Sequence, residues 1–309
     1  MSEIHIESML EREVDMILVV GATGLLGSEI CRRLRGAGHS VRALVRANSA
    51  PDRVGAVQST GAATMIGDLK SPSSLLQACE GVSAVITTAS STFSRQEGDS
   101  IETVDRQGHL NLIDAAKRAA VPHFVHVSIP PDLHYDCPLF QAKRDVEAAL
   151  VRSGIEYTIL QGNYFMEVWL SPTLGFDYPN ARATVYGSGE QPLAWVSYRD
   201  VAGLAVDALG VAAARNRVLL AAGPENLTPL HVVRIFEEMT GRTFTVEHVP
   251  LAALEKQYAE AADPLSRSFA ALTLEYAHGC PMDMRATLDL LPRPLTTIRD
   301  YAATAGRGS

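Results

Sequence analysis

Apolar and polar residues follow two different periods along the first half of the chain. Short apolar runs predict buried strands at residues 17–20, 40–45, 63–66, 82–87, 123–127 and 157–160. Between them, apolar residues that recur every three or four positions predict helices at residues 51–57, 72–78, 101–120 and 139–152, and another directly after the first strand. Strands that alternate with helices predict parallel βαβ units with right-handed crossovers. We therefore expect an α/β protein with a doubly wound parallel sheet.

The pattern changes after residue 160, where the predicted elements become shorter and the sequence contains more glycine and proline. Short strands are predicted at residues 183–186, 193–196, 217–221 and 244–249, with helices at 198–209 and 229–239. We expect a sheet domain at residues 14–160 and a smaller C-terminal substrate-binding lobe at residues 161–309. This lobe should pack on the rim of the sheet and return some elements to its core. Residues 1–13 are predicted to form a tail.

A glycine-rich turn follows the first predicted strand and precedes a predicted helix. Strand, glycine turn and helix is the context of a dinucleotide-binding fingerprint, because the helix N-terminus offers free N–H groups to a pyrophosphate. Gly21 would form the tight turn, Gly24 would let the backbone approach the phosphates, and Gly27 would let the helix pack close to the strand. An ordinary strand–turn–helix junction is the alternative. The residues expected to bind a cofactor here are Gly21, Thr23, Gly24, Leu25, Leu26 and Gly27.

Polar or small residues end the predicted strands. Because ligands of doubly wound sheets bind beyond the carboxyl ends of the strands, these residues should share one rim. The rim residues are Thr23, Arg46, Asp68, Leu69, Thr87, Thr88, Ala89 and Ser128. Asp68 would accept a hydrogen bond from an adenine amino group or cap its own turn, and the small side chains of Thr87, Thr88 and Ala89 would leave room for a ribose. Ser128 is either catalytic or bonded to local backbone.

The end of the second predicted strand favours NADP over NAD. NAD-selective sites place an Asp or Glu about 20 residues beyond the first glycines, on the ribose 2′-hydroxyl. No acidic residue occurs between Glu29 and Asp52, and the strand ends at Arg46 instead. A guanidinium can grip a 2′-phosphate that a carboxylate would repel. The predicted cofactor is therefore NADP(H), with a merely solvated charge at Arg46 as the alternative.

Composition and charge argue against several kinds of partner. The net charge of −8 disfavours nucleic acid and anionic membranes. The first 15 residues lack the basic and apolar regions of a signal peptide, and no apolar run reaches membrane-spanning length. The 4 cysteines are scattered, without metal-ligand or redox spacing. We expect a soluble cytoplasmic protein without a metal, either a monomer or a homodimer.

Several motifs together resemble the NmrA-like, atypical branch of the short-chain dehydrogenase/reductase superfamily, over roughly residues 15–250. Besides the glycine turn, the motifs are VRALVR at 41–46, GDL at 67–69, HVS at 126–128, KRDVE at 143–147 and SGIEYTIL at 153–160. The resemblance implies an NAD(P)-binding Rossmann domain. It also implies kinship with isoflavone-reductase-like enzymes, NADPH-dependent quinone reductases and non-catalytic NADP sensors.

The better-known reductases of this superfamily carry a Tyr-x-x-x-Lys motif. Here Lys143 stands at the lysine position, but Leu139 stands four residues earlier, so the tyrosine is missing. The resemblance implies that Lys143 binds the nicotinamide ribose and presents positive charge to a developing oxyanion. The alternative is a lysine on the polar face of a charged helix. The remaining catalytic candidates are Ser128 and three possible proton donors, Tyr135, His134 and Tyr164.

The segment after the sixth predicted strand indicates an apolar pocket. Residues 161–163 are Gln-Gly-Asn where many relatives carry Arg-Pro-Gly, and this departure suggests an altered substrate site. The expected walls are Asn163, Tyr164, Phe165 and Trp169, although core packing explains the aromatic residues nearly as well. We therefore expect an NADP(H)-dependent reductase that transfers hydride to a small apolar substrate, an aromatic or conjugated carbonyl or a quinone.

Three other functions are compatible with the same residues. The missing tyrosine favours a non-catalytic NADP(H)-binding redox sensor or regulatory protein, which would bind NADPH tightly without turnover. An assembly or scaffold protein would keep the fold without the cofactor. A non-redox isomerase or cyclase would retain NADP(H) and show turnover without net oxidation of the nicotinamide.

Overall fold

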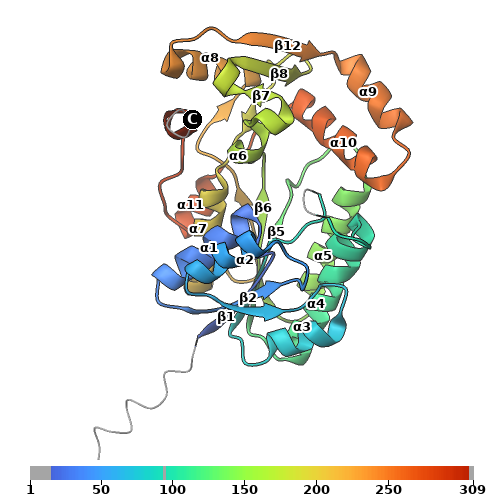
Figure 1. Cartoon of the computed structure of the whole chain (residues 1–309), viewed down its shortest axis with the longest axis vertical. Coiled ribbons are helices and arrows are strands. Elements are labelled where there is room, and N and C mark those ends of the chain that lie inside the picture. Colours follow the sequence, from blue (N-terminus) through green and yellow to red (C-terminus); the bar gives the residue numbers. More distant parts are fainter. Residues whose placement is uncertain (1–14, 93–94, 306–309) are drawn as a thin grey trace, which may run out of the picture.

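A seven-stranded parallel sheet forms the base of the molecule (Figure 1). The computed structural model describes residues 15–92 and 95–305, so the predicted tail at residues 1–13 lies outside the described residues. The strand order is β10-β6-β5-β4-β1-β2-β3, and every neighbouring pair is parallel. The strands are β1 (Met16–Val20), β2 (Ser40–Val45), β3 (Ala63–Ile66), β4 (Ala84–Thr87), β5 (His123–Ser128), β6 (Glu156–Gly162) and β10 (Arg217–Ala221). The doubly wound sheet predicted from the sequence is confirmed.

Helices cover both faces of this sheet. On one face lie α1 (Leu25–Gly36), α2 (Pro51–Ser59), α7 (Tyr198–Gly210) and α11 (Arg285–Leu290). On the other lie α3 (Pro72–Cys79), α4 (Gln107–Arg118) and α5 (Pro138–Arg152). Successive side chains of β1 point to opposite faces. Ile17 and Val19 therefore pack in the first core, while Leu18 and Val20 pack in the second. A strand buried on both sides has no polar position, which explains its unbroken apolar run.

The predicted helix at residues 101–120 begins as a different kind of helix. Its first part, η2 (Ile101–Arg106), is π-helical and leads directly into α4. Ser100 caps its start, because the side chain of Ser100 accepts from the Thr103 amide at 3.0 Å and the Thr103 hydroxyl accepts from the Ser100 amide at 2.9 Å. Asp105 belongs to this π-helical segment and is fully buried.

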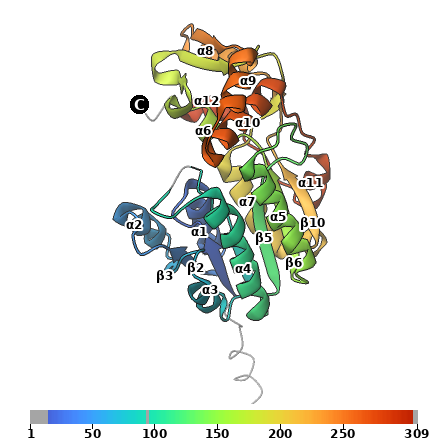
Figure 2. The ribbon, with the colours of Figure 1, turned by 90° about the vertical axis from the view of Figure 1, so that its right-hand side faces the viewer.

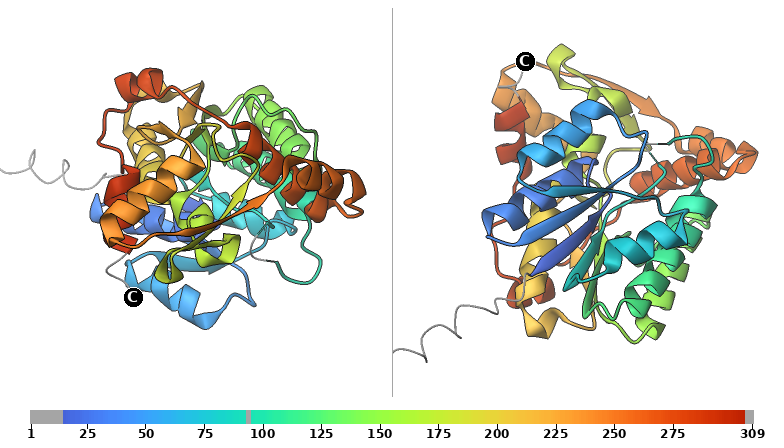
Figure 3. Two further views of the ribbon diagram at one scale, coloured as in Figure 1. Left: turned by 90° about the horizontal axis from the view of Figure 1, so that it is seen from above. Right: turned by 60° about the horizontal axis from the view of Figure 1, so that its bottom comes forward.

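A second lobe lies above the carboxyl ends of the strands (Figures 1 and 3). Its three-stranded sheet has the order β12-β8-β7, with β8 parallel to β12 and antiparallel to β7, and a two-stranded antiparallel pair joins β9 to β11. The strands are β7 (Phe176–Asp177), β8 (Arg182–Tyr186), β9 (Leu193–Ala194), β11 (Asn226–Leu227) and β12 (Thr245–Val249). The helices and helical turns are α6 (Met166–Trp169), η3 (Pro172–Leu174), η4 (Tyr178–Asn180), α8 (Pro229–Thr240), α9 (Leu251–Glu260), α10 (Pro264–His278) and α12 (Ile298–Ala305).

The two parts of the chain are interleaved. After the first elements of the second lobe, the chain returns through α7 and the short turn η5 (Ala212–Ala214) to β10, which pairs with β6 at the edge of the large sheet. Figure 2 shows β10 beside β6 at the edge of the sheet, α7 near them, and α8, α9 and α10 above the sheet. None of the helices within residues 15–92 and 95–305 is both long and apolar enough to cross a membrane.

Candidate functional site

A cavity of about 690 Å³ lies between the carboxyl ends of the sheet strands and the second lobe. It brings together most of the residues that the sequence singled out, from both halves of the chain. Those on its wall are Gly21, Thr23, Gly24, Leu25, Leu26, Arg46, Asp68, Leu69, Thr88, Ala89, Ser128, Lys143, Asn163, Tyr164, Phe165 and Trp169. Gly27, Thr87 and Tyr135 lie outside this wall.

The glycine turn packs closely against its neighbours and leads directly into α1. Gly21 adopts φ of +86°, and a Cβ there would lie 2.8 Å from the backbone nitrogen of Ala89 at the end of β4. A Cβ at Gly27 would lie 2.2 Å from the carbonyl oxygen of Gly21, so only glycine lets α1 pack this close to the turn. Gly24 is the N-cap of α1 and provides no side chain to its first amides. Those amides have no partner within the helix and are available to an anion.

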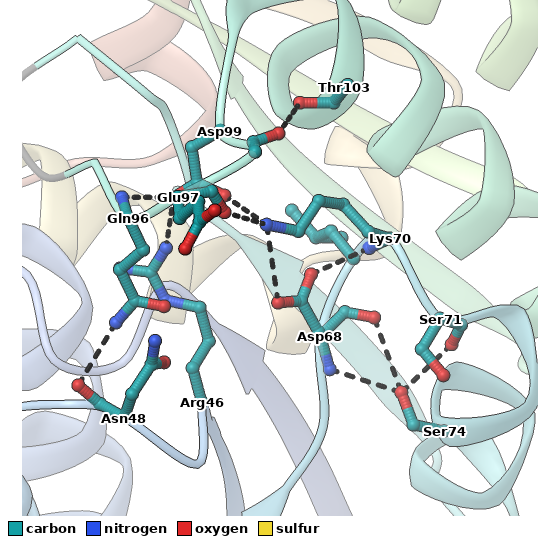
Figure 4. Close-up of polar contacts among 12 residues, drawn as sticks. Arg46, Asn48, Asp68, Lys70, Ser71, Ser74, Gln96, Glu97, Asp99 and Thr103 are labelled. Carbon is teal, nitrogen blue, oxygen red and sulfur yellow. Dashed lines mark hydrogen bonds and ion pairs between the residues drawn. The ribbon is translucent and has the colours of Figure 1, made fainter.

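The arginine after β2 does have an acidic neighbour, which the local sequence did not reveal. Arg46 Nη1 lies 2.5 Å from Oδ2 of Asp99, and Lys70 Nζ contacts the other carboxylate oxygen (Figure 4). Burial opposes ionisation of Asp99, but hydrogen bonds from Lys70 and from the Gln96 amide, together with the charge of Arg46, hold the pKa of Asp99 below its usual value. No acidic residue lies between Glu29 and Asp52, but Asp99, 53 residues beyond Arg46 in the sequence, supplies a carboxylate in space.

Asp68 caps its own turn and also faces the cavity. Its Oδ1 accepts from the backbone amide of Lys70 at 2.8 Å, and its own amide donates to Ser74 Oγ at 3.1 Å (Figure 4). The two roles weighed from the sequence are therefore compatible, since one carboxylate has a second oxygen for a ligand.

Lys143 lies inside the protein rather than on a solvated helix face. Its side chain is 7% exposed, and its Nζ is 4.0 Å from Oδ1 of Asp105. Burial lowers the pKa of Lys143, an effect that Asp105 and then Glu147 partly offset. Asp105 is fixed by Ser91, whose amide and hydroxyl donate to its Oδ2 at 3.0 and 2.6 Å. Sequence reasoning missed Asp105, because nothing in a helical pattern separates a buried acid from an exposed one.

Two buried histidines lie beside this pair. His109 has its Nε2 3.0 Å from Thr87 Oγ1 and its Nδ1 2.9 Å from the carbonyl oxygen of Val104. Its ring centroid lies 5.3 Å from that of His126. Burial, reinforced by the charge of Lys143, lowers the pKa of His109 to about 4 and that of His126 well below its usual value. Thr87 is therefore bonded to a neutral histidine behind the cavity wall.

One candidate hydroxyl faces the cavity. Ser128 ends β5, and among the described residues its buried Oγ has no hydrogen-bond partner. A buried hydroxyl without a hydrogen-bond partner costs folding free energy, and a ligand in the cavity would supply the missing partner.

The three candidate proton donors lie in different parts of the structure. Tyr135 Oη lies 2.8 Å from His278 Nε2, and His134 Nδ1 lies 3.0 Å from Glu275 Oε2, so both residues attach their loop to α10. Neither lines the cavity. Tyr164 does, and its hydroxyl donates to the carbonyl oxygen of Leu272 at 3.1 Å. The structure does not bring Tyr135 to the site because its ring packs against the second lobe.

The far end of the cavity is apolar and aromatic. The rings of Tyr164 and Trp169 meet edge to face at 4.8 Å, and Trp169 stacks on Tyr276 at 5.5 Å. Phe269 and Leu272 from α10 line the same cavity. Asn163 adds a polar atom, since its Nδ2 donates to the Cys280 carbonyl at 2.9 Å while its buried Oδ1 has no partner in the described part of the chain. These side chains both pack the lobe and line the cavity.

The described residues hold no cluster of metal ligands beside these groups. Within the described ranges, three His, Cys, Asp or Glu side chains never come together as ligands would. Cys31, Cys79, Cys137 and Cys280 are buried free thiols.

Comparison with known proteins places the chain in a family. The NmrA-like family matches residues 13–287. The chain belongs to the NmrA-like family. One similar protein is the photosystem II assembly factor Ycf39 of Synechocystis sp., which is 31% identical over 244 residues, covering 77% of this chain and 72% of that protein.

Other similar proteins are named as reductases. The NAD(P)H azoreductase of Xenophilus azovorans is 28% identical over 295 residues, covering 93% of this chain and 96% of that protein. The NADPH-dependent quinone oxidoreductase of Escherichia coli, solved in complex with NADPH, has a TM-score of 0.75 and 23% identity and covers 94% of this chain and 100% of that one. This structural likeness shows that the NmrA-like chain has the same fold as that oxidoreductase.

Proposed function

We propose that this NmrA-like protein is an NADP(H)-dependent reductase of a small apolar substrate, an aromatic or conjugated carbonyl or a quinone. One observation carries the proposal: a single cavity is lined by a glycine turn at the start of α1, a buried lysine and an aromatic wall. The names of the azoreductase and quinone oxidoreductase relatives support the same class of reaction.

Different groups of cavity residues would contact different parts of a bound dinucleotide. The turn residues Gly21 and Gly24 and the first amides of α1 would hold the pyrophosphate. Arg46 would hold the 2′-phosphate. The adenine would lie near Asp68 and Leu69, and its ribose near Thr88 and Ala89. Thr23, Leu25 and Leu26 lie on the cavity wall at this turn, and Gly27 lets α1 pack close to it. Thr87 bonds to His109 behind the wall. When bound, NADPH supplies a hydride from its nicotinamide ring.

The chain itself supplies charge and hydrogen bonds at the other end of the cavity. The ammonium of Lys143 would contact the ribose hydroxyls and stabilise negative charge on the substrate oxygen, and its effect is strengthened by the exclusion of water. Ser128 has a hydroxyl available to donate to the same oxygen. Tyr164 is the one of the three donor candidates whose ring lines the cavity, beside Phe165 and Trp169. These aromatic walls favour a flat apolar substrate.

A substrate panel tests this proposal. The purified protein should consume NADPH, followed by the absorbance of the reduced nicotinamide, with at least one member of a panel of quinones, azo dyes and enones. A parallel titration of NADPH fluorescence measures binding without any substrate. Failure to bind NADPH would overturn the proposed cofactor, and binding without turnover across the panel would favour the second candidate.

The second candidate is an NADP(H)-binding regulatory or assembly protein. It is favoured by Leu139, which lies on the cavity wall four residues before Lys143, where the better-known reductases carry tyrosine. The Ycf39 relative, named as an assembly factor, points in the same direction. Tight NADPH binding that changes the proteolysis pattern of the protein, with no turnover, would distinguish this function from that of a reductase.

A further inference from the structure

Asp99 reaches into the cavity between two cations from other parts of the chain. Arg46 follows β2, Lys70 follows β3, and Asp99 comes from the segment before η2. The Asp99 side chain is 1% exposed, lies 2.5 Å from Arg46 Nη1, and also contacts Lys70 Nζ (Figure 4). This carboxylate therefore bonds to Arg46, the residue that the proposed function assigns to the 2′-phosphate.

The charges of this cluster offset one another. Asp99 faces both cations, and Asp68 Oδ2 lies 3.8 Å from Lys70 Nζ. The cluster of two cations and two carboxylates is therefore close to neutral, although its position beyond β2 suits a phosphate. A dianionic phosphate would enter against the charge of Asp99 at short range and in a partly buried site, where repulsion is weakly screened.

We propose that Asp99 is an internal competitor for the 2′-phosphate and thereby limits how strongly the protein prefers NADPH to NADH. The inference rests on the proposed function, which places the adenosine end of the cofactor beside Arg46. A 2′-phosphate and the Asp99 carboxylate require the same guanidinium and ammonium donors, and only one anion can have them fully. A 2′-hydroxyl makes no such demand, so NADH binding does not depend on the release of Asp99.

Asp99 also holds its own segment in place. Its Oδ2 accepts from the backbone amide of Gln96 at 2.9 Å, and Gln96 Nε2 donates to the carbonyl oxygen of Asn48 at 3.2 Å (Figure 4). The Glu97 carbonyl oxygen accepts from Lys70 at 3.4 Å. Binding of the 2′-phosphate is therefore coupled to this segment, which borders the cavity through Asp99.

The experiment uses two nucleotides that differ only in the phosphate. Calorimetry measures the Kd of 2′,5′-ADP and of 5′-ADP for the full-length protein and for the Asp99→Asn variant. These binding measurements do not require turnover. Glu97→Gln is the matched control, because Glu97 is an exposed acid on the same segment and its loss changes the net charge equally. If thermal melting shows that Asp99→Asn is unfolded, Asp99→Ser replaces it as the test variant, because the serine hydroxyl can still accept a hydrogen bond from the Gln96 amide.

The ratio of the two Kd values decides the question. We expect Asp99→Asn to increase the preference for 2′,5′-ADP about tenfold and Glu97→Gln to change it less than about twofold. An unchanged or reduced preference in Asp99→Asn would show that Asp99 orients Arg46 instead of competing with the phosphate. Absence of binding for both nucleotides in every variant would overturn the proposed cofactor site, and the inference with it.

Discussion

The ammonium of Lys143 and the carboxylate of Asp105 face each other at 4.0 Å inside the protein, although the two residues are 38 positions apart in the sequence and lie on different helices. Neither side chain is more than 7% exposed. A charged lysine at this depth requires a compensating anion, because desolvation disfavours the ammonium. Asp105 is thus the group that keeps Lys143 able to act as a cation at the cavity wall.

Replacement of Asp105 by Asn should lower the pKa of Lys143 further. Burial already lowers this pKa, and the neighbouring carboxylate opposes that effect. Without the carboxylate, the uncharged amine should persist to lower pH, and Lys143 should react with acetic anhydride at lower pH than in the unsubstituted protein. Mass spectrometry of the Lys143 peptide measures this. Asp145→Asn, which removes an exposed acid from the same region, should leave the profile unchanged; equal shifts in both variants would contradict a specific role.

Lys143→Met should separate catalysis from binding. If the ammonium stabilises an oxyanion that forms only in the transition state, kcat should fall by about a hundredfold, or about 2.7 kcal/mol. NADPH affinity should fall much less, because the glycine turn and Arg46 are untouched. Steady-state kinetics with a substrate from the panel, a thermal melt and an NADPH titration provide the comparison. Undiminished turnover would show that other residues stabilise the oxyanion.

Gly24→Val should abolish dinucleotide binding without unfolding the protein. A Cβ at Gly24 meets only the Gly21 carbonyl oxygen, at 3.3 Å, and its extended backbone suits a branched residue. The added methyl groups would stand where the phosphates approach the helix N-terminus. Gly27→Val is the contrasting variant, since its Cβ would lie 2.2 Å from the same oxygen and should destabilise the fold. NADPH binding by a folded Gly24→Val protein would mean that the phosphates lie elsewhere.

Arg46→Ala should remove cofactor preference. We expect the protein to bind NADPH at least tenfold more tightly than NADH, about 1.4 kcal/mol, despite the partial neutralisation by Asp99. Loss of the guanidinium should weaken NADPH binding and leave NADH binding nearly unchanged. Calorimetric titration of both dinucleotides measures the two constants. A similar loss for both would assign Arg46 to the support of the Asp99 segment.

Stability should decrease as the pH falls below neutrality. The pKa of His109 is lowered to about 4 by burial and then by Lys143, so the unfolded chain binds its proton first. The stability that the folded protein gains from keeping His109 neutral is complete above the ordinary histidine pKa. It is lost as pH falls through the interval between 6.5 and about 4. Between pH 7 and 5 this histidine alone should cost about 2 kcal/mol of unfolding free energy. Urea titrations at the two pH values measure the loss, which His109→Gln should reduce and the exposed His231→Gln should not. Equal pH dependence in all three proteins would contradict the assignment.

The sequence predicts the sheet and the rim well because both follow from local pattern. A strand buried on two faces must be apolar throughout, and parallel strands must end at one edge. Those two facts alone bring Arg46, Asp68 and Ser128 to the same cavity. The close packing at Gly27 is equally local, since it depends on the carbonyl oxygen of Gly21, whereas Gly21 itself packs against the distant Ala89.

The partners of these residues are not local, and the sequence does not reveal them. Asp99 binds Arg46 across 53 residues, and Asp105 faces Lys143 from another helix. Asp105 lies in the π-helical segment η2, whose period differs from the roughly 3.6 residues per turn that the sequence pattern assumes, so the pattern does not predict that this acid is buried. Tyr135 shows the same limit, because only the position of α10 draws its hydroxyl to His278 and away from the cavity. The cytoplasmic location and the choice between monomer and homodimer stay predictions.

The return of the chain through α7 to β10 also determines the order in which the protein can be completed during synthesis. The face of the sheet formed by Ile17 and Val19 is covered by α1 at once, but by α7 only after residue 210 has left the ribosome. Until then a nascent chain with six finished strands exposes apolar surface and the open edge of β6. The first half is therefore expected to depend on the second for protection from aggregation, so the sheet and the lobe that covers its ligand cavity should mature as one cooperative unit.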